Sequence, residues 1–164
     1  MKKHKIYILI LSILMIVVLA VGYGTNSSSE TASTVNPNTE NAEEVQNNTM
    51  KLQIGEEVFT VTLVENSSTE ALKELLAKGP VTINMRDYGN MEKVGGLGTS
   101  LPRNDEQITT KPGDLILYLG NSLVIYYEPN SWNFTRLGKI NDITQEELKE
   151  VLGSGNVTVT LYLD

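Results

Sequence analysis

Much of the stretch from residue 50 onward alternates between apolar and polar residues, and this pattern predicts β-strands. Seven short runs rich in Val, Ile, Leu, Thr and Tyr cover residues 51–54, 58–64, 81–86, 115–119, 123–127, 135–140 and 157–163. In the last run, Val157, Val159 and Leu161 alternate with threonines. A period of two residues is that of a strand with one face toward a core and the other toward solvent. The sequence therefore predicts a mainly β domain.

Two of these runs, 115–119 and 123–127, are apolar at almost every position rather than at every second one. A strand that is apolar on both faces is covered on both faces. Gly120 and Asn121 lie between the two runs and are typical turn residues. We therefore expect a central hairpin that is covered on the outside of the sheet as well as on the inside.

Two other segments carry helix signals. Ser67 with Glu70, and Thr144 with Glu147, have the spacing of a capping box at the start of a helix, and a glycine follows within about twelve residues in both cases. Each predicted helix is short and has one apolar stripe. Two such helices are best explained as caps on a closed antiparallel barrel, because a sandwich has no open ends to cover.

The residue composition excludes several kinds of chemistry. The chain has no cysteine and one histidine, His4, which precedes the predicted domain. Disulfides, thiol nucleophiles, Ser-His-Asp catalysis and zinc sites that need His or Cys are therefore excluded from that domain. The net charge of −7 argues against a nucleic-acid partner, which requires a basic surface. We expect no cofactor and no metal.

The N-terminus carries an apolar run. Residues 6–21 contain one residue that is not apolar, Ser12, and lysines precede the run at positions 2, 3 and 5. Segment 1–21 is therefore predicted to be an uncleaved membrane anchor or a cleaved signal peptide. Both alternatives leave the lysines on the cytoplasmic side and the rest of the chain outside the cytoplasm, membrane-anchored or secreted.

The next segment, residues 22–49, is polar and acidic, with few apolar residues. Such a composition cannot bury enough surface to offset the entropy of the chain, so we expect a disordered linker. Residues 50–164 then form one domain of ordinary size.

Two stretches of this domain have characteristic sequences. Residues 87–93 are Asp-Tyr-Gly-Asn-Met-Glu-Lys, and residues 120–127 are Gly-Asn-Ser-Leu-Val-Ile-Tyr-Tyr. The first resembles the segment after the first helix of small bacterial cyclophilin-like domains, and the second resembles their Gly-Asn-x-Leu-x-Ile-Phe-Tyr hairpin. The resemblance covers nearly all of residues 50–164 and implies a closed cyclophilin-like β-barrel with two short capping α-helices.

The resemblance also bears on catalysis. Cyclophilins proper are peptidyl-prolyl isomerases whose groove relies on an Arg in a Phe-His-Arg element and on a Gln-Gly-Gly-Asp element. The predicted domain has no His and nothing like Gln-Gly-Gly-Asp. Arg86 ends the predicted strand after the first helix, near the place of that Arg. The resemblance therefore leaves Arg86 as the one candidate catalytic residue.

Aromatic residues gather between positions 118 and 134. We predict that Tyr88, Tyr126, Trp132 and Arg136 line a shallow groove on the barrel for a peptide or a small ligand.

Charged residues lie near the glycine-rich segment 95–98, which we expect to be a mobile loop. Asp87, Glu92 and Lys93 flank this loop and have the residue types of an acid/base pair. Charged residues beside a loop are most often solvated surface, and we favour that interpretation.

The function favoured by the sequence is an extracytoplasmic binding module without catalysis, and the alternative is a weak peptidyl-prolyl isomerase that uses Arg86.

Overall fold

The computed structural model describes residues 48–164. The predicted anchor or signal peptide, residues 1–21, and all but the end of the predicted linker lie outside the described residues. Within residues 48–164, no helix is long and apolar enough to cross a membrane.

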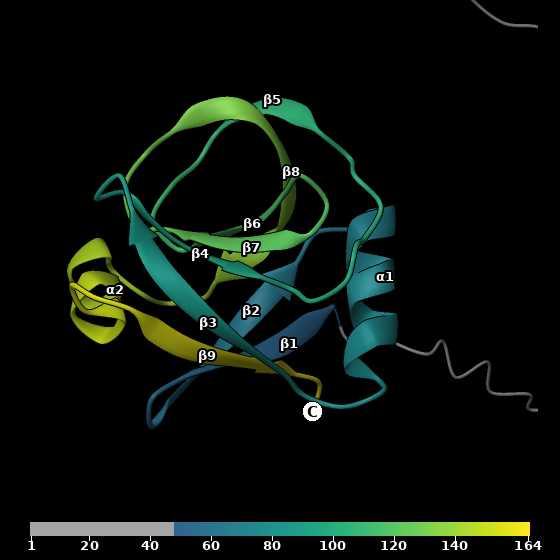
Figure 1. Ribbon diagram of the computed structural model, residues 1–164, viewed down its shortest axis with the longest axis horizontal. Coiled ribbons are helices and arrows are strands. Elements are labelled where there is room, and N and C mark those ends of the chain that lie inside the picture. Colours follow the sequence, from purple (N-terminus) through teal and green to yellow (C-terminus); the bar gives the residue numbers. More distant parts are fainter. Residues whose placement is uncertain (1–47) are drawn as a thin grey trace, which may run out of the picture. The chain divides into compact units, whose positions relative to one another are not determined.

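Eight antiparallel strands form a closed barrel (Figure 1). Their order around the ring is β2-β1-β9-β3-β4-β7-β6-β8, and β8 pairs with β2 to close it. A ninth strand, β5, pairs with the first part of β8 outside this ring. The strands are β1 (Thr49–Ile54), β2 (Glu57–Leu63), β3 (Val81–Tyr88), β4 (Glu92–Gly96), β5 (Glu106–Thr109), β6 (Asp114–Tyr118), β7 (Ser122–Tyr126), β8 (Ser131–Ile140) and β9 (Val157–Tyr162). The predicted closed β-barrel is thus confirmed.

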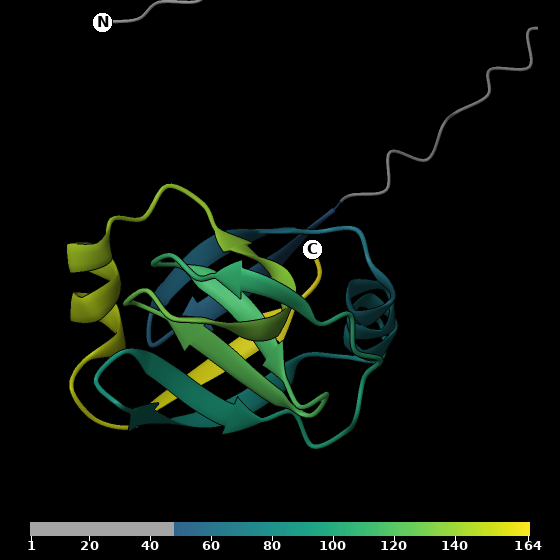
Figure 2. The same cartoon turned by 90° about the horizontal axis from the view of Figure 1, so that it is seen from above.

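Two helices, α1 (Ser67–Leu76) and α2 (Gln145–Leu152), lie at opposite sides of the barrel (Figure 2). The predicted capping box of Thr144 and Glu147 is present at the start of α2. The capping box at the start of α1 is formed by Asn66 and Thr69, one residue before the predicted pair of Ser67 and Glu70. Asn66 is the cap there, and its side chain accepts a hydrogen bond from the Thr69 backbone N–H at 2.9 Å.

The Asn66 cap has a second contact that explains its position. Its Nδ2 donates to the Arg136 carbonyl of β8 at 2.9 Å, so one side chain both starts α1 and attaches it to the barrel. Asn caps a helix as well as Ser does, and its amide carries the acceptor and the donor on separate atoms, so that one side chain bonds in both directions.

Apolar side chains form two separate clusters. The larger one fills the barrel and includes Leu115, Leu117, Leu123 and Ile125 of the β6–β7 hairpin. The smaller one lies on the outer face of the same hairpin and consists of Ile116, Val124, Tyr126 and Phe134, with Ile108 of β5 packed against it. The prediction that this hairpin is covered on both faces is therefore confirmed.

The first half of the glycine-rich segment, residues 95–96, belongs to a strand rather than to the predicted mobile loop, and Leu97 and Gly98 follow the end of that strand. Gly95 and Gly96 belong to β4 and pair with Leu123 and Ser122 of β7. A Cβ on Gly95 would lie 2.6 Å from the Ile83 side chain and 2.7 Å from the Asn84 carbonyl. Glycine at this position therefore permits a close approach of β3 to β4.

A buried lysine joins three parts of the fold. Lys93 of β4 has no exposed surface, and its ammonium donates to Asp87 Oδ2 of β3 at 2.7 Å. It also donates to the carbonyls of Gly153 and Gly155, in the loop after α2, at 2.8 Å and 2.7 Å. Tyr127 completes the network by donating its hydroxyl to Asp87 at 2.9 Å. The predicted solvated position of Lys93 was wrong.

Replacing this lysine with a neutral side chain should destabilise the barrel. In Lys93→Met, the Asp87 carboxylate loses its cation and two carbonyls lose their donor, so we expect a loss of about 3–5 kcal/mol in the free energy of unfolding. Urea denaturation of the full-length chain measures it. The double variant Lys93→Met/Asp87→Asn should recover part of the loss, and Lys139→Met, at an exposed lysine of β8, should lose almost nothing. Equal stability of Lys93→Met and Lys139→Met would contradict this account.

Candidate functional site

A cavity of about 450 Å³ lies on the outer face of the barrel. Two rows of paired residues place their side chains there. Arg86 is opposite Val94, and Val94 is opposite Val124. Tyr88 is opposite Glu92, which is opposite Tyr126. Directly paired residues point to the same face of a sheet, and Val124 and Tyr126 belong to the outer apolar cluster, so both rows face outward.

Exposed apolar side chains gather around this cavity. Among the described residues, five large hydrophobic side chains are exposed, and four of them line it: Tyr88, Tyr118, Leu119 and Trp132, each between 40% and 62% exposed. The fifth, Val58, does not. Single exposed apolar residues are common on soluble proteins, whereas a contiguous group marks an interaction surface.

Leu119 has an unfavourable backbone conformation. It lies in the tight turn between β6 and β7, followed by Gly120, with φ angles of 51° and 78° at the two positions. Such turns favour Asn or Gly at the first position, because a side chain with φ above zero clashes with its own backbone. The side chain is 58% exposed and so gains little from packing within the chain. A strained residue at a cavity is a sign of functional constraint.

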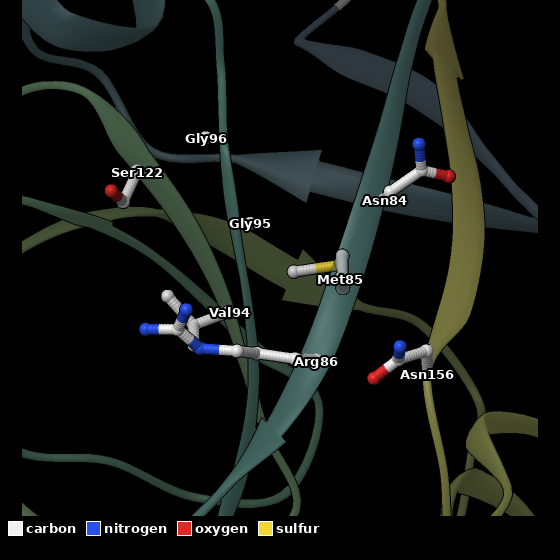
Figure 3. Close-up of a pocket in the computed structure, with 8 residues that line it drawn as sticks. All are labelled: Asn84, Met85, Arg86, Val94, Gly95, Gly96, Ser122 and Asn156. Atoms are coloured by element: carbon white, nitrogen blue, oxygen red, sulfur yellow. The ribbon is translucent and has the colours of Figure 1, made fainter.

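Arg86 is the cation of this cavity. It is exposed, and no described residue forms an ion pair with it. It also lines an adjoining hollow of about 330 Å³, with Asn84, Gly96 and Asn156 (Figure 3). Figure 3 shows the Arg86 side chain extending beside Val94 of β4. A guanidinium without an internal partner is available to an anion or to a carbonyl oxygen.

Glu92 is the carboxyl group of this cavity, and it is only 8% exposed. Burial raises its pKa, and a hydrogen bond with the Tyr126 hydroxyl partly opposes that shift. No cation pairs with it among the described residues. Burial and Glu92 together raise the pKa of Tyr126 well above its usual value, and Asn130 donates to its hydroxyl at 3.2 Å.

Three of the four predicted groove residues, Tyr88, Tyr126 and Trp132, thus line one cavity. The fourth, Arg136, does not line it. Its guanidinium lies 3.0 Å from Oδ2 of Asp114, whose side chain is fully buried. Arg136 therefore compensates a buried carboxylate, and Arg86 provides the cation in the cavity.

The charged residues expected at the glycine segment belong to two different environments. Neighbouring residues of a strand point to opposite faces, so Glu92 faces the outer cavity while Lys93, with Asp87, faces the barrel end near α2. They do not form one acid/base site. The burial of Glu92 was missed because the two glycines concealed the alternation along β4. Within residues 48–164, no group of three Asp, Glu, His or Cys side chains is placed to hold a metal ion.

Comparison with known proteins agrees with this architecture. Residues 52–162 match the cyclophilin-like family. No curated protein matches the sequence. The solution structure of the hypothetical protein AF2241 from Archaeoglobus fulgidus is similar, with a TM-score of 0.54 and 11% identity over 71% of this chain and 94% of that one. The structure of McbB in complex with tryptophan is similar with a TM-score of 0.51 and 18% identity, over 70% of this chain and 44% of that one. At these identities the likeness concerns the fold.

The strain at Leu119 predicts a stabilising substitution. Leu119→Asn should raise the free energy of unfolding by about 1 kcal/mol, because Asn tolerates the left-handed conformation that Leu resists. Leu119→Ala is the matched control. It also removes most of the leucine side chain, but alanine does not share the preference of Asn for the left-handed backbone conformation. Urea denaturation of both variants measures the effect. A Leu119→Asn variant no more stable than Leu119→Ala would contradict the assignment of strain.

The raised pKa of Glu92 predicts a dependence of stability on pH. A carboxyl whose pKa is higher in the folded chain contributes most stability below its unfolded pKa, near 4, and that contribution is lost as the pH rises through the folded pKa. Glu92→Gln should therefore be more stable than the natural chain at pH 7, and the difference should vanish below pH 4. Thermal unfolding at several pH values measures this. A constant difference across the range would show that Glu92 titrates normally.

Proposed function

The chain belongs to the cyclophilin-like family, and from this premise we propose that its barrel is a binding module that takes an apolar peptide or small ligand in the outer cavity. The observation that carries the proposal is that, of the five large hydrophobic side chains exposed within residues 48–164, four gather at one cavity. Apolar surface left in water costs about 25 cal/mol per Å², and a ligand that covers it recovers this free energy.

The cavity also has the mixed lining of small-molecule sites, which are mostly apolar with a few polar groups that fix orientation. Its aromatic residues Tyr88, Tyr126 and Trp132 belong to strands, so the barrel holds their backbones in place before a ligand arrives. Arg86 and Glu92 are its charged groups. Preformed walls lower the entropy cost of binding.

The proposed place of action is outside the cytoplasm. The apolar run at residues 6–21, with lysines before it, supports export or anchoring of the barrel.

A weak peptidyl-prolyl isomerase is the second candidate, and one observation favours it. Arg86 lies in the cavity, exposed and without an ion pair among the described residues, where it is available to donate to a prolyl amide. A protease-coupled isomerisation assay on the full-length chain separates the candidates. The binding module predicts no rate enhancement, whereas an enhancement that Arg86→Ala removes would establish the isomerase.

Fluorescence tests the proposed binding directly, because Trp132 is the one tryptophan of the chain. Titrating the full-length protein with proline-containing peptides and with cell-wall fragments should give a saturable change in emission for at least one of them. Tyr88→Ala should weaken that response at least tenfold, and Val58→Ala, an exposed apolar residue outside the cavity, should leave it unchanged. A folded sample whose emission responds to none of them would contradict the proposal.

A further inference from the structure

Glu92 is a nearly buried carboxyl group for which residues 48–164 supply no positive partner. Its side chain lines the cavity, and its hydrogen-bond partner there, the Tyr126 hydroxyl, is neutral. Buried carboxylates normally pair with a cation, as Asp114 does with Arg136 on the same barrel. The absence of such a partner from residues 48–164 leaves the place of the cation open to a ligand.

Arg86 has the complementary property. Its guanidinium lines the same cavity, and no described residue forms an ion pair with it. A planar guanidinium donates two parallel hydrogen bonds to a carboxylate, a geometry that a carbonyl oxygen cannot fully use. This end of the cavity is therefore suited to an anionic group.

The strand register places these two groups close together. Arg86 is paired with Val94, and Glu92 lies two residues away on the same face of β4. Such diagonal neighbours have backbones about 7–8 Å apart. Although they have opposite charges at this separation, they form no ion pair with each other. A ligand that carries both charges on a short framework would satisfy both groups at once.

The aromatic residues that line the cavity indicate the size and the apolar character of the rest of this ligand. Tyr126 and Phe134 pack with ring centroids 5.5 Å apart, and the exposed rings of Tyr88 and Trp132 lie at the same cavity. Aromatic rings attract an ammonium group as well as apolar side chains. A volume of about 450 Å³ belongs to the small end of ligand sites, so it fits one residue-sized molecule.

Resting on the proposed function, we propose that the ligand is a zwitterion of the α-amino acid class with a large apolar side chain. Arg86 binds its carboxylate, Glu92 binds its ammonium group, and the aromatic walls enclose its side chain. This inference names both charges of the ligand, whereas the proposed function requires only its apolar part.

Three matched probes test the inference: L-phenylalanine, N-acetyl-L-phenylalanine and L-phenylalaninamide. The acetyl group removes the positive charge, and the amide removes the negative one. Titrations of the full-length chain followed by Trp132 emission should give saturable binding of L-phenylalanine and at least tenfold weaker binding of each blocked probe.

Two variants assign each charge to its residue. In Glu92→Gln, the penalty for acetylation should fall below threefold while the penalty for amidation remains. Arg86→Met keeps an apolar side chain without the charge. In this variant, the penalty for amidation should fall below threefold while the penalty for acetylation remains. Glu106→Gln, at an exposed carboxylate of β5 that does not line the cavity, should retain both penalties. Circular dichroism confirms that each variant is folded.

The outcomes separate this inference from the proposed function. Equal affinity for all three probes would overturn the zwitterion while leaving an apolar binding site in place. The zwitterion would also be overturned if none of the three probes binds at millimolar concentration while Trp132 responds to a proline peptide or a cell-wall fragment. The apolar binding site would again stand. If Trp132 responds to none of these molecules, both proposals fail.

Discussion

The buried ammonium of Lys93 is the interaction on which the arrangement of the barrel and of its outer face depends. It binds Asp87 of β3 and two carbonyls of the loop between α2 and β9, so that one side chain joins the β3–β4 hairpin to a loop about 60 residues away in the sequence. A buried charge tolerates little displacement of its partners, because each lost hydrogen bond leaves it less compensated. The Tyr127 hydroxyl adds a further bond to Asp87, and burial and this carboxylate raise the pKa of Tyr127 to about 12. The network therefore fixes β3 and β4 relative to each other.

That constraint reaches the cavity because residues alternate along a strand. Lys93 faces the interior, so its neighbour Glu92 faces outward, and Arg86 and Tyr88 flank the inward Asp87 in the same way. Three locally unfavourable features meet on this outer face: a group of exposed apolar side chains, a leucine with a positive φ angle, and a nearly buried carboxyl with no cation beside it among the described residues. Sequences that are locally consistent elsewhere concentrate such conflicts at functional sites. This convergence supports the outer cavity as the site of binding.

Residue type and alternation were enough to predict seven strands, and the unbroken apolar runs were enough to predict the two-sided cover of the β6–β7 hairpin. The capping signals were enough to place two helices. β4 was missed because its Gly95 and Gly96 have no side chains to alternate, and β5 because four residues carry too little pattern. Arg136 was assigned to the cavity in place of Arg86, since the choice depends on the strand register, which is irregular between Leu115 and Ile116. The burial of Lys93 was not predictable either, because two of its partners are backbone carbonyls of a distant loop.

We propose the outer face of β3, β4, β7 and β8 as the binding surface of this barrel. The most direct measurement is a map of amide chemical-shift changes in ¹⁵N-labelled full-length protein on addition of L-phenylalanine. The account predicts changes confined to residues around the cavity, led by the indole N–H of Trp132 and the backbones of Arg86 and Glu92. Changes centred instead on the distant β1–β2 hairpin and α2, or spread evenly over the domain, would contradict it.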